Sequence, residues 1–115
     1  MLNEDVKTWL LDILMAIDEI ESYFENTPKT LDNFYENVLL RRGIERDLEI
    51  IGEALNRALK VEQNLSVSNA RKIVDTRNKI IHGYDEIAED VIWAIVIKHL
   101  PILKKEVKKI LEEDN

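Results

Sequence analysis

The chain has 115 residues, contains no cysteine and carries a formal net charge of −7. This length suits one domain spanning residues 1–115, and a hydrophobic content of 45% is enough for a core without covalent cross-links. The lack of cysteine excludes disulfides and thiolate metal sites, and the acidic charge argues against a broad nucleic-acid-binding surface. A few basic residues, or two chains together, would have to hold any nucleic acid.

The N-terminal segment does not have the profile of a secretory signal, because it carries Asn3, Glu4, Asp5 and Lys7. The longest purely apolar runs are too short to span a bilayer. We therefore expect a cytoplasmic protein with no membrane partner.

The first predicted helix has a single apolar stripe whose members recur at steps of three and four residues. The stripe consists of Val6, Leu10, Ile13, Ile17, Ile20 and Phe24. Asn3 or Asp5 would cap its start. Asn26-Thr27-Pro28 would end it, since proline disfavours helix at the residue before it.

A second helical stretch is predicted to open at Thr30 or Asp32 and to run to about Glu62. Gly43 lies near its middle and would weaken or bend it, so we expect a bend or an extra short helix in this stretch. Its apolar stripe consists of Leu40, Ile44, Leu48, Ile51, Leu55 and Leu59.

The third predicted helix begins at a cap formed by Ser66 or Ser68 and ends at Ile81, with Gly83 just past the end as a C-cap glycine. The fourth runs from about Ala88 to Glu112, and Pro101 in its interior predicts a kink. Its stripe consists of Ile92, Ile95, Val96, His99, Ile102, Leu103, Val107 and Ile110. Four amphipathic helices with short connections predict an all-α fold, an antiparallel four-helix bundle.

The residues with most chemical potential lie at the end of the third helix: Arg77, Asn78, His82 and Tyr84. Arginine holds phosphate oxygens through a planar fork of donors, and histidine suits proton transfer near neutral pH. Asn78 and His82 share one helix face, whereas Arg77 lies roughly 140° around the axis from His82 and must curl back toward it. Gly83 would turn the chain and bring Tyr84 over the same spot. The set indicates chemistry on a phosphodiester.

A structural interpretation of the same residues stays open. Arg77 would then pair with Asp75 or another acid on a helix surface, and His82 would be a polar residue favoured by the helix dipole. Tyr84 would lie half-buried under the following loop.

Other polar residues give no metal site. His99, the second histidine, is best interpreted as partly buried or at an interface, with no ligand set around it. Glu45, Glu49 and Glu53 recur at steps of four, but the Glu-x-x-His motif of di-iron bundles is missing. We interpret these acids as solvated or as partners in inter-helix ion pairs, and we expect neither a metal nor a cofactor.

Arg77 through Tyr84 reads as R-N-x3-H-x-Y near the end of a third helix, and residues 48–54 upstream read L-E-I-I-G-E-A. The last helix adds the segment Leu100-Pro101-x-Leu103. Over nearly the whole chain this pattern resembles the HEPN superfamily, and specifically its HepT-like ribonuclease toxins. R-x4-H alone would be a weak signal, whereas the combination is much more specific.

The resemblance implies a homodimer that cleaves RNA without a metal at a composite site in the dimer interface. Arg77 would stabilise the transition state, His82 would transfer protons, and Asn78 would orient a group or hold phosphate. It also implies a toxin-antitoxin pair, in which an MntA-like minimal nucleotidyltransferase neutralises the toxin by transferring AMP to Tyr84. Two alternatives remain: a non-catalytic nucleotide- or partner-binding subunit of a nucleotidyltransferase complex, and a purely structural helical dimer.

Overall fold

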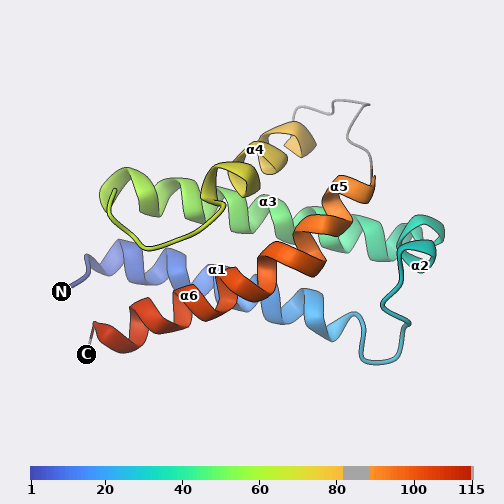
Figure 1. Ribbon diagram of the computed structural model, residues 1–115, viewed down its shortest axis with the longest axis horizontal. Coiled ribbons are helices and arrows are strands. Elements are labelled where there is room, and N and C mark those ends of the chain that lie inside the picture. The colour runs from blue at the N-terminus through green and yellow to red at the C-terminus, as the bar shows by residue number, and fades with distance from the viewer. Residues whose placement is uncertain (82–88, 115) are drawn as a thin grey trace.

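The computed structural model describes residues 1–81 and 89–114. Four helical segments run in alternating directions and form an antiparallel four-helix arrangement (Figure 1). The elements are α1 (Glu4–Ser22), α2 (Leu31–Glu36), α3 (Val38–Val61), α4 (Ala70–Ile81), α5 (Glu89–Ala94), the π-helical turn η1 (Ile95–His99) and α6 (Leu100–Glu113). The predicted all-α bundle is confirmed: the described residues contain helices and no strand.

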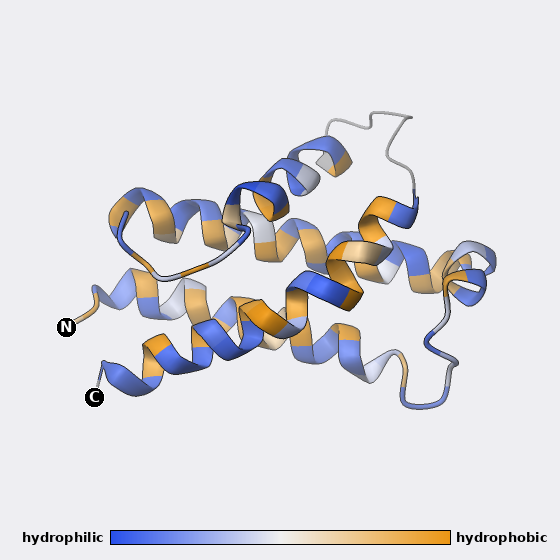
Figure 2. Cartoon of the chain, in the orientation of Figure 1, coloured by the Kyte–Doolittle hydropathy of each residue, from blue (hydrophilic) through white to orange (hydrophobic). Residues whose placement is uncertain are grey.

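The core is built from the apolar faces of α1, α3 and the segment from α5 to α6. Figure 2 shows hydrophobic and hydrophilic residues alternating in short stretches along these helices, as amphipathic helices require. Every predicted stripe residue of α1 and α3 is buried except two. Phe24, just beyond the end of α1, and Leu59 are partly buried against the core. Hydrophobic burial at helical spacing therefore decides where these two helices face each other.

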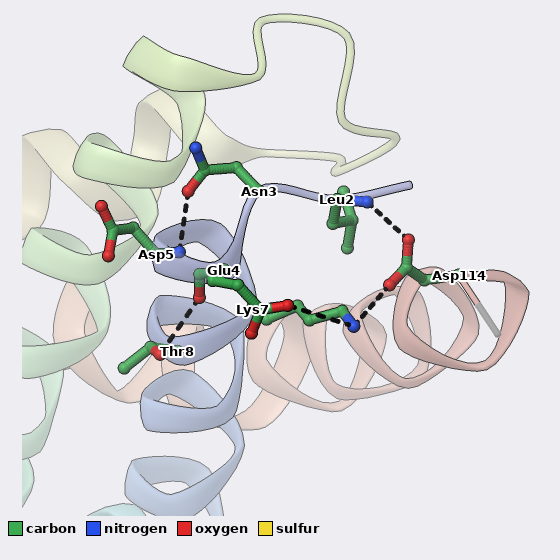
Figure 3. A network of polar contacts seen from close by, with 7 residues as sticks. All are labelled: Leu2, Asn3, Glu4, Asp5, Lys7, Thr8 and Asp114. Atoms are coloured by element: carbon green, nitrogen blue, oxygen red, sulfur yellow. Dashed lines mark hydrogen bonds and ion pairs between the residues drawn. The ribbon is translucent and has the colours of Figure 1, made fainter.

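The two chain termini are joined by one buried carboxylate, Asp114. It accepts a hydrogen bond from the backbone N–H of Leu2 at 2.6 Å and forms an ion pair with Nζ of Lys7 at 2.9 Å (Figure 3). Next to this contact, Asn3 caps α1 by accepting from the N–H of Asp5, as one of the two predicted caps. The start of α1 and the end of α6 are thus held side by side.

The second helical stretch is broken at Asn37 and not bent at Gly43. Thr30 caps α2, as predicted, and Asn37 ends α2 and caps α3 by accepting from the N–H of Leu40. The predicted extra short helix is therefore present, but α3 runs unbroken through Gly43. A side chain at Gly43 would crowd the ring of Tyr23, 3.1 Å from its built Cβ, so this glycine serves the α1–α3 approach.

Helix α2 contributes one buried aromatic ring to the end of the bundle. Phe34 is fully buried, with its ring centroid 5.4 Å from that of Trp93 on α5. Phe24 meets the edge of Trp93 at 5.8 Å. These three aromatic residues close the end of the core opposite the termini.

The fourth helical segment departs from a regular helix one turn before Pro101. Proline has no N–H and its ring crowds the carbonyl four residues earlier, which here belongs to Ile97 inside η1. The N–H of Leu100 instead reaches back five residues to the carbonyl of Ile95. The prediction that Ile102 belongs to the buried stripe is wrong: it is 45% exposed, while its neighbour Leu103 is fully buried.

Helix α4 starts later than a serine cap would place it. Its first residue is Ala70, preceded by Asn69 in the left-handed conformation with φ of 60°. Ser68 does not cap it but donates through its N–H and its hydroxyl to the carboxylate of Glu106 on α6. The helix is described as far as Ile81, so its predicted end and the C-cap at Gly83 stay predictions.

One carboxyl group is buried between α1 and α3. Asp47 is 1% exposed and accepts a hydrogen bond of 2.8 Å from the hydroxyl of Tyr23, whose oxygen also lies 2.9 Å from Oε1 of Glu19. Burial, and secondarily the nearby Glu19, raises the pKa of Asp47 to about 6. This polar cluster joins the two longest helices at the end where α1 stops.

Candidate functional site

Helices α3 and α4 make their closest approach at Gly52 and Arg77. A Cβ atom built on Gly52 would lie 2.3 Å from Cβ of Arg77 and 2.6 Å from Cγ. Only glycine leaves room for the arginine stem at this position. The Gly52-Glu53 pair within residues 48–54 therefore places α3 directly beneath the arginine of the motif.

The guanidinium of Arg77 is held by two oxygen atoms from different helices. Nη2 pairs with Oε2 of Glu53 on α3, and Nη1 donates to Oδ1 of Asn78 at 2.6 Å. The Arg77 side chain is only 20% exposed. The sequence predicted that Arg77 would pair with Asp75 or another acid. The observed partner is Glu53 on the neighbouring helix α3.

Arg77 lies at the edge of a groove formed by α1, α3 and α4. The groove has a volume of about 320 Å³. Arginines and acids line it in equal number, three of each, beside apolar side chains. The lining residues are Trp9, Asp12, Arg46, Glu49, Ile50, Glu53, Ala54, Arg57 and Arg77. The groove is therefore electrically balanced in a chain whose net charge is −7.

The structure brings together two of the four predicted site residues. Arg77 and Asn78 are in contact, whereas His82 and Tyr84 lie outside the described residues, as does Gly83. The expected approach of Arg77 and Asn78 to His82 stays a prediction.

Glu53 was missed as a site residue by the sequence reasoning. In the sequence it is one of three acids at steps of four, for which solvent exposure or an inter-helix ion pair is predicted. The ion-pair interpretation is right for Glu53, which pairs with Arg77, while Glu45 and Glu49 pair within α3 with Arg42 and Arg46. The signal that would have found it is the Gly-Glu sequence itself, since a helix glycine marks a close approach of a second helix.

His99 lies in η1, away from any set of ligands. It is partly buried, and desolvation, followed by the positive charges of Lys72 and Lys98, lowers its pKa. Within residues 1–81 and 89–114, no group of three or more His, Asp or Glu side chains is placed to hold a metal ion. Over the same residues, no helix combines the length and apolarity needed to cross a bilayer.

The domain is an antiparallel helical bundle with a polar cluster where α3 and α4 meet. The cluster consists of Arg77, Asn78 and Glu53. The family model described as Ribonuclease HepT-like matches residues 13–110, and the chain belongs to this family. The family resemblance of the R-N-x3-H-x-Y pattern is thereby confirmed.

Curated relatives carry related names. "Putative RNase MJ1380" of Methanocaldococcus jannaschii is 33% identical over 94% of this chain and 98% of its own length. "Putative RNase TTE0752" of Caldanaerobacter subterraneus subsp. tengcongensis is 34% identical over 74% of this chain and 77% of its own. "Gamma-glutamylcyclotransferase and putative RNase MJ0434" of M. jannaschii is 33% identical over 97% of this chain. The chain spans half the length of that last relative. No solved structure matches the chain.

Proposed function

We propose that this protein is a metal-independent endoribonuclease, the toxin of a toxin-antitoxin pair, with Arg77, Asn78 and His82 as its catalytic residues. The observation that carries the proposal is the held guanidinium of Arg77 in a chain of the HepT-like ribonuclease family. Arg77 is largely shielded from water and fixed by two partners, as expected of a group that must stabilise developing charge without reorganising.

The proposed reaction is an internal transesterification. The 2′-hydroxyl oxygen of one nucleotide attacks the adjacent phosphorus, and the bond to the 5′-oxygen of the next nucleotide breaks. His82 moves the protons: one leaves the 2′-hydroxyl, and one is delivered to the departing 5′-oxygen. Arg77 stabilises the extra negative charge on the phosphorane oxygens, and Asn78 orients the guanidinium to which it is bonded.

A second copy of the chain would complete this site. One histidine per chain cannot readily act as base and acid in the same step, whereas a two-fold dimer brings two copies of His82 and Arg77 into one cleft. Pairing two Arg77 side chains would also concentrate positive charge locally in an acidic protein. We expect sedimentation of the purified protein to give the mass of a dimer.

Neutralisation would take place at Tyr84. In the proposed modification the tyrosine oxygen attacks the α-phosphorus of ATP bound to a cognate MntA-like nucleotidyltransferase, and pyrophosphate leaves. The tyrosyl-AMP would put an anion two residues from His82, where it competes with substrate phosphate for Arg77. Tyr84→Phe should cleave RNA like the wild type, yet gain no mass when incubated with the partner enzyme and ATP.

The nuclease proposal is tested by RNA cleavage in the presence of EDTA. His82→Ala should abolish cleavage and growth inhibition while leaving the unfolding temperature nearly unchanged. His99→Gln, which replaces the other histidine, is the matched control and should retain activity. Undiminished cleavage by folded His82→Ala would contradict the assignment. Tight RNA or nucleotide binding by a wild type that never cleaves would favour a non-catalytic binding subunit instead.

A further inference from the structure

The carboxylate of Glu53 connects two arginines. Oε1 accepts from Nε of Arg57, one turn later on α3, at 2.8 Å. Oε2 pairs with Nη2 of Arg77 on α4. Each oxygen is therefore committed to a different guanidinium, and the carboxylate has little freedom to rotate away from Arg77.

We propose that Glu53 is the positioning residue of the nuclease site: it holds Arg77 in the orientation that meets the scissile phosphate, and Arg57 holds Glu53. The inference rests on the proposed function, since it assigns Glu53 a role through Arg77. Glu53 itself contacts neither the phosphorus nor the attacking oxygen in this scheme.

Packing along the Arg77 side chain makes its positioning by Glu53 effective. Gly52 lets the Cβ and Cγ of Arg77 lie directly against α3, so the first part of the side chain is fixed by packing. The remaining torsions of a long arginine side chain keep considerable conformational freedom. Glu53 on one terminal nitrogen and Asn78 on the other fix the plane of the guanidinium. The planar fork is thus oriented before substrate arrives.

The negative charge of Glu53 should affect RNA binding and the chemical step differently. A carboxylate beside Arg77 weakens the binding of a phosphate, because it partly cancels the arginine charge. Removing that charge should therefore tighten RNA binding, while freeing the guanidinium should slow the chemical step. A positioning role therefore predicts a lower kcat with an unchanged or lower KM, whereas a role limited to stability predicts a lower unfolding temperature with unchanged kinetics.

The test compares Glu53→Gln with Glu49→Gln in the purified 115-residue chain. Glu49 lies one turn earlier on α3, lines the same groove and pairs with Arg46 at 3.7 Å, so it matches Glu53 in place and charge. For Glu53→Gln we expect kcat to fall by about tenfold to a hundredfold, as for a misplacement of about 1 Å, with KM unchanged or lower. Glu49→Gln should keep the wild-type kcat. Glu53→Asp retains the charge but not the reach, and should also lose kcat.

A second readout does not depend on cleavage. In nitrogen-15 NMR spectra, the Nη protons of Arg77 should give separate signals in the wild type and in Glu49→Gln, because the ion pair slows rotation of the guanidinium. These signals should merge or broaden in Glu53→Gln. Unchanged kcat in Glu53→Gln, or equal losses in both variants, would overturn the inference. If the wild type cleaves no RNA, the proposed function fails. Unaltered Arg77 signals in Glu53→Gln would show, independently of cleavage, that Glu53 does not position Arg77.

Discussion

Gly52 of α3 and Arg77 of α4 lie so close together that a methyl group on Gly52 would overlap the Cβ of Arg77 at 2.3 Å. The contact involves the start of the arginine side chain, next to the backbone, and not its flexible end. Position 52 therefore sets the distance between the two helices at the candidate site.

Gly52→Ala should lower both stability and activity. The added methyl group forces α4 away from α3, at a cost of about 1–3 kcal/mol for overpacking, offset by about 1 kcal/mol of helix propensity. Displacement of Arg77 should reduce RNA cleavage by more than the fraction of unfolded protein explains. Urea unfolding and cleavage rates measure the two effects. Gly43→Ala is the control: its methyl group meets the ring and hydroxyl oxygen of Tyr23 at 3.1–3.2 Å, not Arg77, and should leave cleavage unchanged.

Asp47 should make stability depend on pH near neutrality. Its pKa in the folded protein is raised to about 6, so the folded state binds the proton more tightly than the unfolded state. The resulting stabilisation is fully present below the usual carboxyl pKa of about 4 and is lost as the pH rises through 6. The difference in unfolding free energy between the wild type and Asp47→Asn should therefore grow as the pH falls from 7.5 to 4.5. A difference that stays constant over this range would contradict the assignment.

Asp114 should show the opposite dependence. The hydrogen bond from Lys7, and next that from the N–H of Leu2, lowers the pKa of this carboxyl group. Its contribution to stability is therefore present above the usual carboxyl pKa and is lost as the pH falls through the lowered value. Asp114→Asn should speed amide hydrogen exchange in the first turn of α1 at pH 7. Glu113→Gln, a substitution in the last turn of α6, should not, since Glu113 pairs with Lys109, at 3.9 Å, and not with the N-terminal segment.

Local patterns predicted the bundle well because its helices are amphipathic over several turns. The stripe from Val6 to Ile20 is buried throughout, and Asn3 and Thr30 cap the helices where short polar side chains were expected to. An extra short helix is expected in the second helical stretch, but the position of the break at Asn37 is not, because an asparagine that ends one helix and caps the next leaves the apolar spacing almost intact.

Features that depend on two helices could not be derived from spacing. The partner of Arg77 is 24 residues away in the sequence, on a helix that also carries Glu45, Asp47 and Glu49. The consequence of Pro101 also lies upstream of the proline, in the π-helical turn η1. Motif spacing identified Arg77 and Asn78, but only tertiary packing identifies Glu53.

The most direct test of the proposed nuclease site is the initial rate at which Arg77→Ala cleaves single-stranded RNA in EDTA, with Arg71→Ala as the control. Arg71 is an exposed arginine on the same helix. We expect the wild type and Arg71→Ala to cleave at similar rates and to leave 2′,3′-cyclic phosphate and 5′-hydroxyl ends. Folded Arg77→Ala should lose activity by at least about a hundredfold, the scale of removing one donor to a developing anion. Cleavage by Arg77→Ala at the wild-type rate would contradict the assignment.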